Sequence, residues 1–185
     1  MAEIKPFTPV KLICGIIASD KKIFEFAEEE LSLLYGEIDY SSNLIPFNFT
    51  DYYERQMGPG LKRKFISFKE LIDPSELSQI KIRTNQLEEE IKEKLKLEIR
   101  AVNLDPGYLT RSALIIATAK DFAHRVPLKD GIYAHLELLF RKKEIKVLEW
   151  TYPDFKTEEY QRIFLEIRKI YLGQLKNLRR EKDGF

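Results

Sequence analysis

The pattern of hydrophobic residues in the first third of the chain predicts strands separated by a helix. KLICGIIA, residues 11–18, is a continuous apolar run of strand length that contains β-branched residues, which is typical of a buried strand. Asp20 can cap a following helix whose apolar positions recur at helical spacing, and Gly36 can end it. LIPFNF, residues 44–49, and KRKFISF, residues 62–68, predict two further strands.

A second helix is predicted from Asp73, which can act as N-cap with Pro74 at the first helical position. Its buried stripe consists of Leu77, Ile80, Leu87, Ile91 and Leu95. KLEIRAVNL, residues 96–104, then predicts a strand. The resulting order, β-α-β-β-α-β, is that of the split βαβ or ferredoxin-like arrangement, in which two helices cover one face of an antiparallel sheet.

The second part of the chain predicts an antiparallel β-meander that ends in one long helix. Its strand-like runs are ALIIATAK (113–120), HRVPL (124–128), GIYAHLELLF (131–140) and IKVLEW (145–150). Thr157 can cap the C-terminal helix. We therefore predict an α+β fold with a ferredoxin-like part over 1–109 and a meander plus helix over 110–185. Because no linker or repeat separates the parts, residues 1–185 are predicted to form a single domain, with the meander extending the first sheet or packing beside it.

The stretch NLDPGYL, residues 103–109, begins at the end of the strand predicted over 96–104 and breaks it with Asp-Pro-Gly. Asp105, Pro106, Gly107 and Tyr108 fit a type II turn, in which proline sets the second position and glycine supplies the positive φ of the third. The turn explains the proline and the glycine fully and Asp105 in part, since its carboxylate can accept a backbone N–H. Asn103 lies two residues earlier, hence on the same strand face, which also allows both side chains to point at a ligand.

One edge of the second predicted helix is polar. Lys81, Asn85 and Glu88 follow one another along it, and Thr84 interrupts the neighbouring apolar stripe. This edge is either a solvated face with one Lys-Glu pair or the wall of a cleft against the sheet. In the second case Lys81 would bind a phosphate or a carboxylate, with Thr84 and Asn85 as neutral hydrogen-bonding groups.

The two histidines lie on either side of a predicted hairpin. If Asp130-Gly131 forms a two-residue loop, Val126 lies opposite His135 and His124 lies opposite Glu137. His124, His135 and Glu137 would then share one sheet face, as weak candidates for metal ligands or proton carriers. The alternative is a half-exposed polar surface, and we predict no metal site.

Composition narrows the class of protein. Net charge is +1, but residues 1–98 hold 14 basic and 18 acidic residues and residues 99–185 hold 17 and 12. This balance disfavours nucleic acid as a partner, although the C-terminal half could present a local basic face. The single cysteine, Cys14, and the absence of a signal-like or membrane-spanning run predict a cytoplasmic protein without a membrane partner. The charged fraction of 33% is typical of a heat-adapted source.

The absence of known motifs disfavours several kinds of binding site, and five ordered segments give a family resemblance. The chain contains no P-loop, no G-x-G-x-x-G after a strand, no H-E-x-x-H and no C-x-x-C, which disfavours P-loop phosphate binding, dinucleotide binding and cysteine zinc sites. TDYYERQMGPGLKRKFISF, IKIRTNQLEEEI, RAVNLDPGYLT, AHRVPLKDGIYAHLELLF and WTYPDF, taken in order, resemble an uncharacterised prokaryotic family, the domain of unknown function numbered 4416. Members often carry an automatic label of GTP-binding protein, so the resemblance implies that label and no functional residue.

These observations lead to one main functional hypothesis. The protein binds a small anionic ligand, such as a nucleotide, in a cleft near the ends of the first sheet. The predicted ligand-binding residues are Lys81, Thr84, Asn85, Asn103, Asp105, Lys120, His124 and Arg125. Asp105 and His124 are the candidates for an acid or base if the protein is an enzyme. The alternative is an interaction module that holds RNA or a protein on its sheet face or its basic C-terminal half. Cofactor and oligomeric state are left open.

Overall fold

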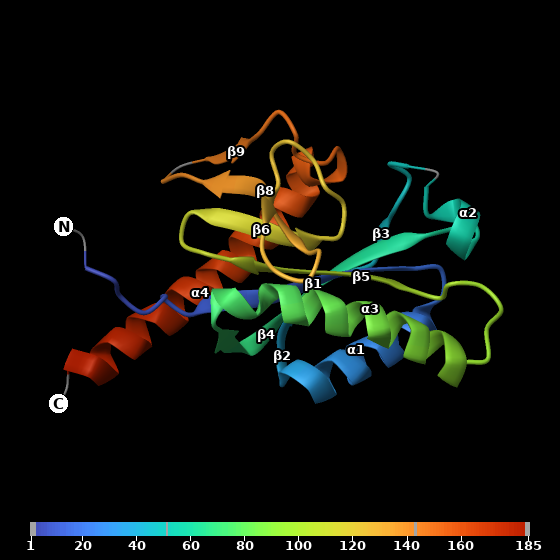
Figure 1. Cartoon of the computed structure of the whole chain (residues 1–185), viewed down its shortest axis with the longest axis horizontal. Helices are drawn as coiled ribbons and strands as arrows, with labels where there is room; N and C mark the ends of the chain where they lie inside the picture. Colours follow the sequence, from blue (N-terminus) through green and yellow to red (C-terminus); the bar gives the residue numbers. More distant parts are fainter. Residues whose placement is uncertain (1–2, 51, 143, 184–185) are drawn as a thin grey trace.

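A computed structural model describes residues 3–50, 52–142 and 144–183 of the chain. The α+β prediction is confirmed: four α-helices accompany a nine-stranded sheet within the described residues (Figure 1). The helices are α1 (Lys21–Tyr35), α2 (Glu54–Met57), α3 (Leu77–Lys94) and α4 (Glu158–Asp183). The strands are β1 (Val10–Ala18), β2 (Ile38–Ser41), β3 (Ile45–Pro46), β4 (Lys62–Ile72), β5 (Asn103–Leu109), β6 (Ala113–Thr118), β7 (Val126–Pro127), β8 (Tyr133–Phe140) and β9 (Ile145–Val147).

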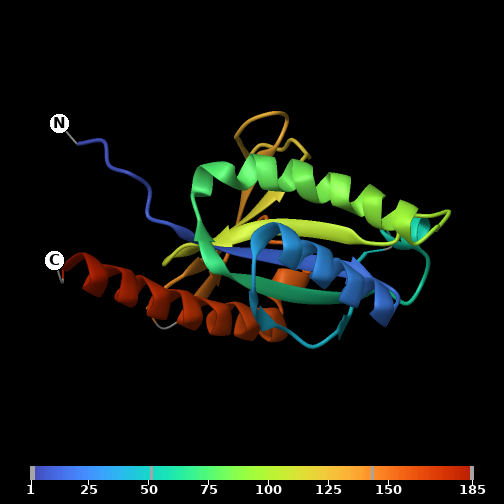
Figure 2. The same ribbon diagram turned by 90° about the horizontal axis from the view of Figure 1, so that it is seen from below.

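One sheet contains the strands of both parts of the chain. Its order is β2-β4-β1-β5-β6-β8-β7, with β3 paired to β4 and β9 paired to β8. All of these described pairings are antiparallel. The meander therefore extends the first sheet through the β5–β6 pair. Helices α1 and α3 lie side by side on one face, and α4 crosses the other (Figure 2).

Strand β1 lies inside the sheet, between β4 and β5, and is buried on both faces, as its apolar run predicts. Leu12, Cys14 and Ile16 pack in the core beneath α1 and α3. Ile13 points toward the opposite face of the sheet. There it packs with Phe65 of β4 in the core that α4 covers. Because side chains alternate along a strand, such burial requires hydrophobic residues at consecutive positions.

The predicted starts of the first two helices are confirmed by side-chain caps. The Asp20 carboxylate accepts a hydrogen bond from the Lys22 N–H at 2.7 Å, and Gly36, with φ of +89°, ends α1. Asp73 accepts from the Ser75 N–H at 2.8 Å and caps a short 3-10 turn that leads into α3. At the other end of the predicted stripe, Leu95 lies beyond α3 and is exposed.

Three predictions between residues 38 and 109 were wrong. The strand predicted over 44–49 is only the two-residue β3, and β2 and α2 were not predicted. Most of 96–104 is not strand; β5 begins at Asn103. The Asp-Pro-Gly turn is also wrong, because β5 continues through it to Leu109.

The local environment of β5 explains why proline and glycine lie inside a strand. Pro106 is paired with Cys14 of β1, whereas pairing with β6 begins only at Gly107, opposite Ile116. At Pro106 the strand therefore has a neighbour on one side only, where a residue without an N–H is tolerated. A Cβ at Gly107 would lie 2.4 Å from the Ile115 carbonyl oxygen, so glycine allows β6 to approach closely.

No helix among the described residues is long and apolar enough to cross a membrane.

Replacing Gly107 by alanine tests the close approach of β6. We expect Gly107→Ala to lower the free energy of unfolding by about 1–3 kcal/mol, because the new methyl group overpacks the β5–β6 pair. Gly173→Ala is the matched control: its methyl group meets nothing within 4 Å, and alanine in a helix should stabilise the protein by about 0.5–1 kcal/mol. Urea denaturation measures both. Equal stability of the Gly107 variant and the wild type would contradict this account.

Candidate functional site

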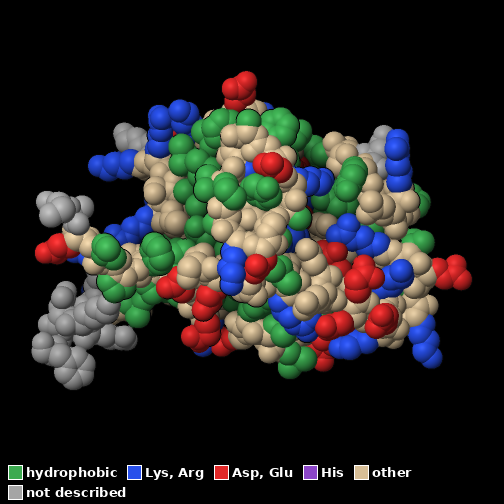
Figure 3. Space-filling model, in the orientation of Figure 1, with side chains coloured by type: hydrophobic (Ala, Val, Ile, Leu, Met, Phe, Trp, Pro, Cys, Tyr) green, Lys and Arg blue, Asp and Glu red, His purple; other side chains and the backbone are tan. Residues whose placement is uncertain are grey.

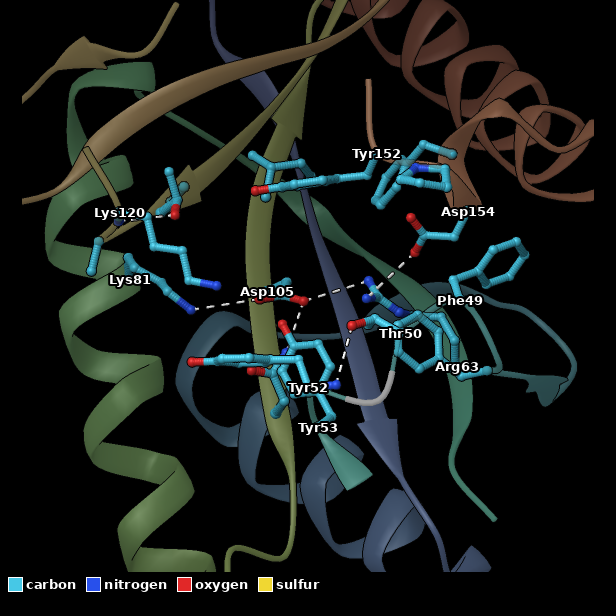
Figure 4. Close-up of a pocket in the computed structure, with 18 of the residues that line it drawn as sticks. Phe49, Thr50, Tyr52, Tyr53, Arg63, Lys81, Asp105, Lys120, Tyr152 and Asp154 are labelled. Atoms are coloured by element: carbon cyan, nitrogen blue, oxygen red, sulfur yellow. Dashed lines mark hydrogen bonds and ion pairs between the residues drawn. The ribbon is translucent and has the colours of Figure 1, made fainter. Parts of the chain in front are cut away.

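A cavity of about 450 Å³ opens where β5 and β6 separate (Figure 4). Its walls come from the loop before α2, helix α3 and the segment between α3 and β5, strands β4, β5 and β6, the turn after β6, and the segment before α4. The lining residues are Phe47, Phe49, Thr50, Tyr52, Tyr53, Arg63, Lys81, Asn85, Arg100, Asn103, Asp105, Ile116, Ala117, Thr118, Ala119, Lys120, Tyr152, Pro153, Asp154 and Phe155. Pairing between β5 and β6 begins only at Gly107. The polar residues of β5 before that point, Asn103 and Asp105, therefore face the cavity.

Arg63 of β4 is the most deeply buried cation of the site, with 5% of its side chain exposed. Its Nη1 lies 3.5 Å from the Asp105 carboxylate and its Nη2 lies 3.6 Å from the Asp154 carboxylate. The guanidinium also lies over the Phe47 ring, 4.9 Å from the centroid. Its Nε is buried without a hydrogen-bond partner among the described residues. The arginine therefore keeps hydrogen-bonding capacity that the surrounding side chains do not use.

Burial and charge oppose each other at this arginine. Burial lowers the pKa of Arg63, but the Asp105 and Asp154 carboxylates outweigh burial, so the pKa is raised. Burial raises the pKa of Asp154, and Arg63 offsets part of that rise. The arginine thus stays charged, while the buried aspartate is ionised less readily than an exposed one.

Asp105 lies between two cations of the lining, Arg63 and Lys81. One carboxylate oxygen faces Arg63 and accepts from the Asn103 amide at 2.8 Å. The other oxygen lies 3.8 Å from the Lys81 ammonium, which also donates to the Leu104 carbonyl at 2.7 Å. Figure 4 shows Asp105 between the two cations. The type II turn is therefore not what positions this aspartate.

A second ion pair fixes the start of β5. The Glu88 carboxylate of α3 accepts from the Leu104 N–H at 2.6 Å and from the Arg100 guanidinium. Arg100 donates to the Asn103 side-chain oxygen at 2.6 Å. Burial raises the pKa of Glu88, while Arg100 and Lys81 oppose the rise. This network holds Asn103 in the orientation that presents its amide to Asp105.

Tyr152 forms a wall of the cavity and rests on a buried polar cluster. Its ring stacks on the His135 ring, with centroids 4.8 Å apart and planes at 2°. Arg125 donates from Nε to His135 Nδ1 at 3.2 Å and from Nη2 to the Tyr152 hydroxyl at 2.9 Å. His135 Nδ1 is thus an acceptor, which assigns the ring proton to Nε2. That atom lies 2.7 Å from Glu137 Oε2, without the angle of an aligned hydrogen bond.

The structure brings five of the eight predicted ligand-binding residues together: Lys81, Asn85, Asn103, Asp105 and Lys120 line the cavity. Thr84 does not, because it is fully buried and its hydroxyl donates to the Lys81 carbonyl at 3.0 Å. Arg125 lies behind the wall and donates to the Lys120 carbonyl at 2.7 Å. His124 lies outside the lining, where partial burial beside His135 and Arg125 lowers its pKa.

The predicted hairpin register was wrong by one residue. Val126 pairs with Ala134 and not with His135, and the Leu128 N–H donates to the Ile132 carbonyl at 2.8 Å. The loop between these residues is therefore one residue longer than a two-residue turn allows.

The metal-ligand candidates form a line of contacts and not a cage. His124 Nε2 lies 3.2 Å from His135 Nδ1, and His135 lies between His124 and Glu137. Residues 3–50, 52–142 and 144–183 contain no group of three or more His, Cys, Asp or Glu side chains placed to hold a metal.

Three of the most important lining residues were not predicted from the sequence. Arg63, Tyr152 and Asp154 were not among the predicted site residues, although all three line the cavity. One signal was available for Arg63. It lies two residues before Phe65 in a predicted strand, so both share one face, and a charged residue on a buried face calls for a partner.

The model of the domain of unknown function DUF4416 matches residues 8–171. The chain belongs to this family. The match includes every lining residue of the cavity, so the site lies within the DUF4416 region. A search of curated proteins and a search of solved structures each gave no significant match.

Removing the charge of Arg63 tests the two ion pairs. In this DUF4416 member we expect Arg63→Met to lower the free energy of unfolding by about 3–5 kcal/mol at neutral pH, since the buried Asp154 carboxylate loses its cation and the partly buried Asp105 carboxylate keeps only Lys81. Burial already raises the pKa of Asp154, and without Arg63 this pKa rises further above the unfolded value, so folding takes up a proton and the loss should shrink in acid. Urea denaturation at pH of about 4.5 and about 7.5 measures this.

Lys69→Met is the control for this variant. Lys69 lies on the same strand, pairs with Glu37 and has 56% of its side chain exposed, so its loss should be small at either pH. An equal loss for Arg63→Met at the two pH values would show that packing, and not charge, accounts for the effect.

Proposed function

We propose that the protein binds a small anionic ligand in the cavity between β5, β6 and α3. The observation that carries the proposal is the charge of the lining, which has four cationic side chains against two carboxylates. Arg63, Lys81 and Arg100 face carboxylates at ion-pair distance. Lys120 has none within that distance among the described residues; its ammonium lies 4.3 Å from the centroid of the Tyr52 ring. A bound anion would give Lys120 an opposite charge to pair with.

The cations differ in how they can contact an anion. Arg63 offers a planar set of donors in a buried site, where an ion pair is stronger than in water. Lys81 keeps two of its three donors after its bond to the Leu104 carbonyl. Lys120 is exposed and can move toward a ligand. A volume of about 450 Å³ is in the range of small-molecule sites.

A catalytic role stays a hypothesis, with Asp105 as its strongest candidate. Asp105 lies in the cavity beside Asp154, whereas His124, the other candidate, does not line it. Two carboxylates with different surroundings are a common arrangement for acid and base chemistry.

The alternative function, an interaction module for RNA or protein, has a different surface to use. Phe65 and Phe68 of β4 are fully buried beneath helices, so the first part of the sheet offers no open aromatic face. Hydrophobic side chains gather at the top of Figure 3, over the segment between β6 and β8, where Phe122, Val126 and Leu128 are exposed. A protein partner would fit this patch better than RNA would, because its exposed side chains are hydrophobic.

We also infer the ferredoxin-like arrangement for residues 10–109. It is supported by the strand order β2-β4-β1-β5, by antiparallel neighbours throughout, and by α1 and α3 following β1 and β4. A single domain over 1–185 is supported by the sheet that runs through both parts. A cytoplasmic location stays a prediction, supported by the single, buried Cys14.

Thermal-shift measurements with inorganic phosphate, pyrophosphate, citrate, nucleotides and sugar phosphates test the anion proposal. We expect at least one anion to raise the melting temperature, because a ligand that binds only the folded state stabilises it by mass action. Lys120→Gln and Lys81→Gln should each weaken the binding of that anion roughly tenfold or more. Lys69→Gln, outside the cavity, should leave it unchanged. If no anion stabilises the protein, or if a polyamine does so instead, the proposal fails.

A further inference from the structure

We propose that the anion held by this cavity carries a planar aromatic ring, which stacks on the free face of Tyr152. The inference rests on the proposed function and specifies its ligand as an aromatic carboxylate or an aromatic phosphate ester. It follows from the way Tyr152 is held, from the chemistry of the wall and from the place of the charges.

The contacts of Tyr152 hold its ring in one orientation, so that the ring offers a flat surface for stacking. His135 covers one face of the ring in a parallel stack, so the opposite face is the one that lines the cavity. The hydroxyl is tied to Arg125, and Arg125 is tied in turn to the Lys120 carbonyl. The Tyr152 N–H donates to Glu137 Oε1 at 2.6 Å. Because both ends of the residue are held, stacking on it costs little side-chain entropy.

The remaining wall favours a ring over a polyhydroxylated chain. Apart from Tyr152, five of the nineteen other lining residues are aromatic: Phe47, Phe49, Tyr52, Tyr53 and Phe155. The Asn103 side chain is already engaged at both ends, by Arg100 and by Asp105. A sugar would bring several hydroxyls that need partners, whereas an aromatic ring needs only faces and edges to contact.

The charges lie opposite the Tyr152 ring. In Figure 4, Tyr152 lies above Asp105, while Lys81 and Lys120 lie to one side and Arg63 to the other. A ring beneath Tyr152 would therefore reach a cation from either edge. A carboxylate or phosphate in the plane of the ring could contact Lys81 and Lys120 without leaving the stack.

Phenyl phosphate and cyclohexyl phosphate form a matched pair of probes, since they share charge and approximate size and differ in the π-face. We expect phenyl phosphate to bind the wild-type chain roughly two- to tenfold more tightly in an NMR titration. Tyr152→Phe should keep this preference because the ring remains. Tyr152→Leu should abolish it while both probes still bind. Tyr133→Leu, a half-buried tyrosine outside the lining, is the control and should keep it.

The wild-type chain also gives a readout that needs no variant. The ring protons of bound phenyl phosphate should shift upfield from the ring current of Tyr152. Equal affinities for the two probes without such a shift would overturn the aromatic-ring inference but leave the anion proposal standing. Binding of inorganic phosphate without either ester would do the same. If no anion binds, both proposals fall.

Discussion

The buried positive charge of Arg63 is the constraint on which the rest of the site depends. A guanidinium inside a protein is stable only beside negative charge, and here the two carboxylates come from different parts of the chain. Asp105 belongs to β5 and Asp154 to the segment that leads into α4. One arginine of β4 thereby connects β5 with the segment that leads into α4.

The cavity itself results from the place where two strands separate. Pro106 and Gly107 mark the point at which β6 joins β5, so the residues before them lie beside open space. Asn103 and Asp105 project into it, and the turn after β6 brings Lys120 to the other side. The end of the β5–β6 pairing at Gly107 thus supplies both the volume of the site and its polar floor.

Sequence reasoning was most successful where a single periodic pattern decides the structure. The two-sided burial of β1, the caps at Asp20 and Asp73, and the polar edge of α3 all follow from residue spacing. The hypothesis of a common cleft also placed Lys81 and Asp105 together, and their charged groups lie 3.8 Å apart in the structure. Sequence reasoning failed at Asp-Pro-Gly, where local turn preference is overridden by pairing with β1, and at the hairpin, where one extra loop residue shifts the register.

The sequence by itself determined the α+β class, the strand β1 that is buried on both faces, the principal helices and five of the residues that line the cavity. These depend on burial and capping, which act between residues close in the chain. Only the tertiary structure decided that Arg63, Tyr152 and Asp154 belong to the same site. Their proximity depends on strand order and on the docking of the segment before α4, and no local preference encodes either of these.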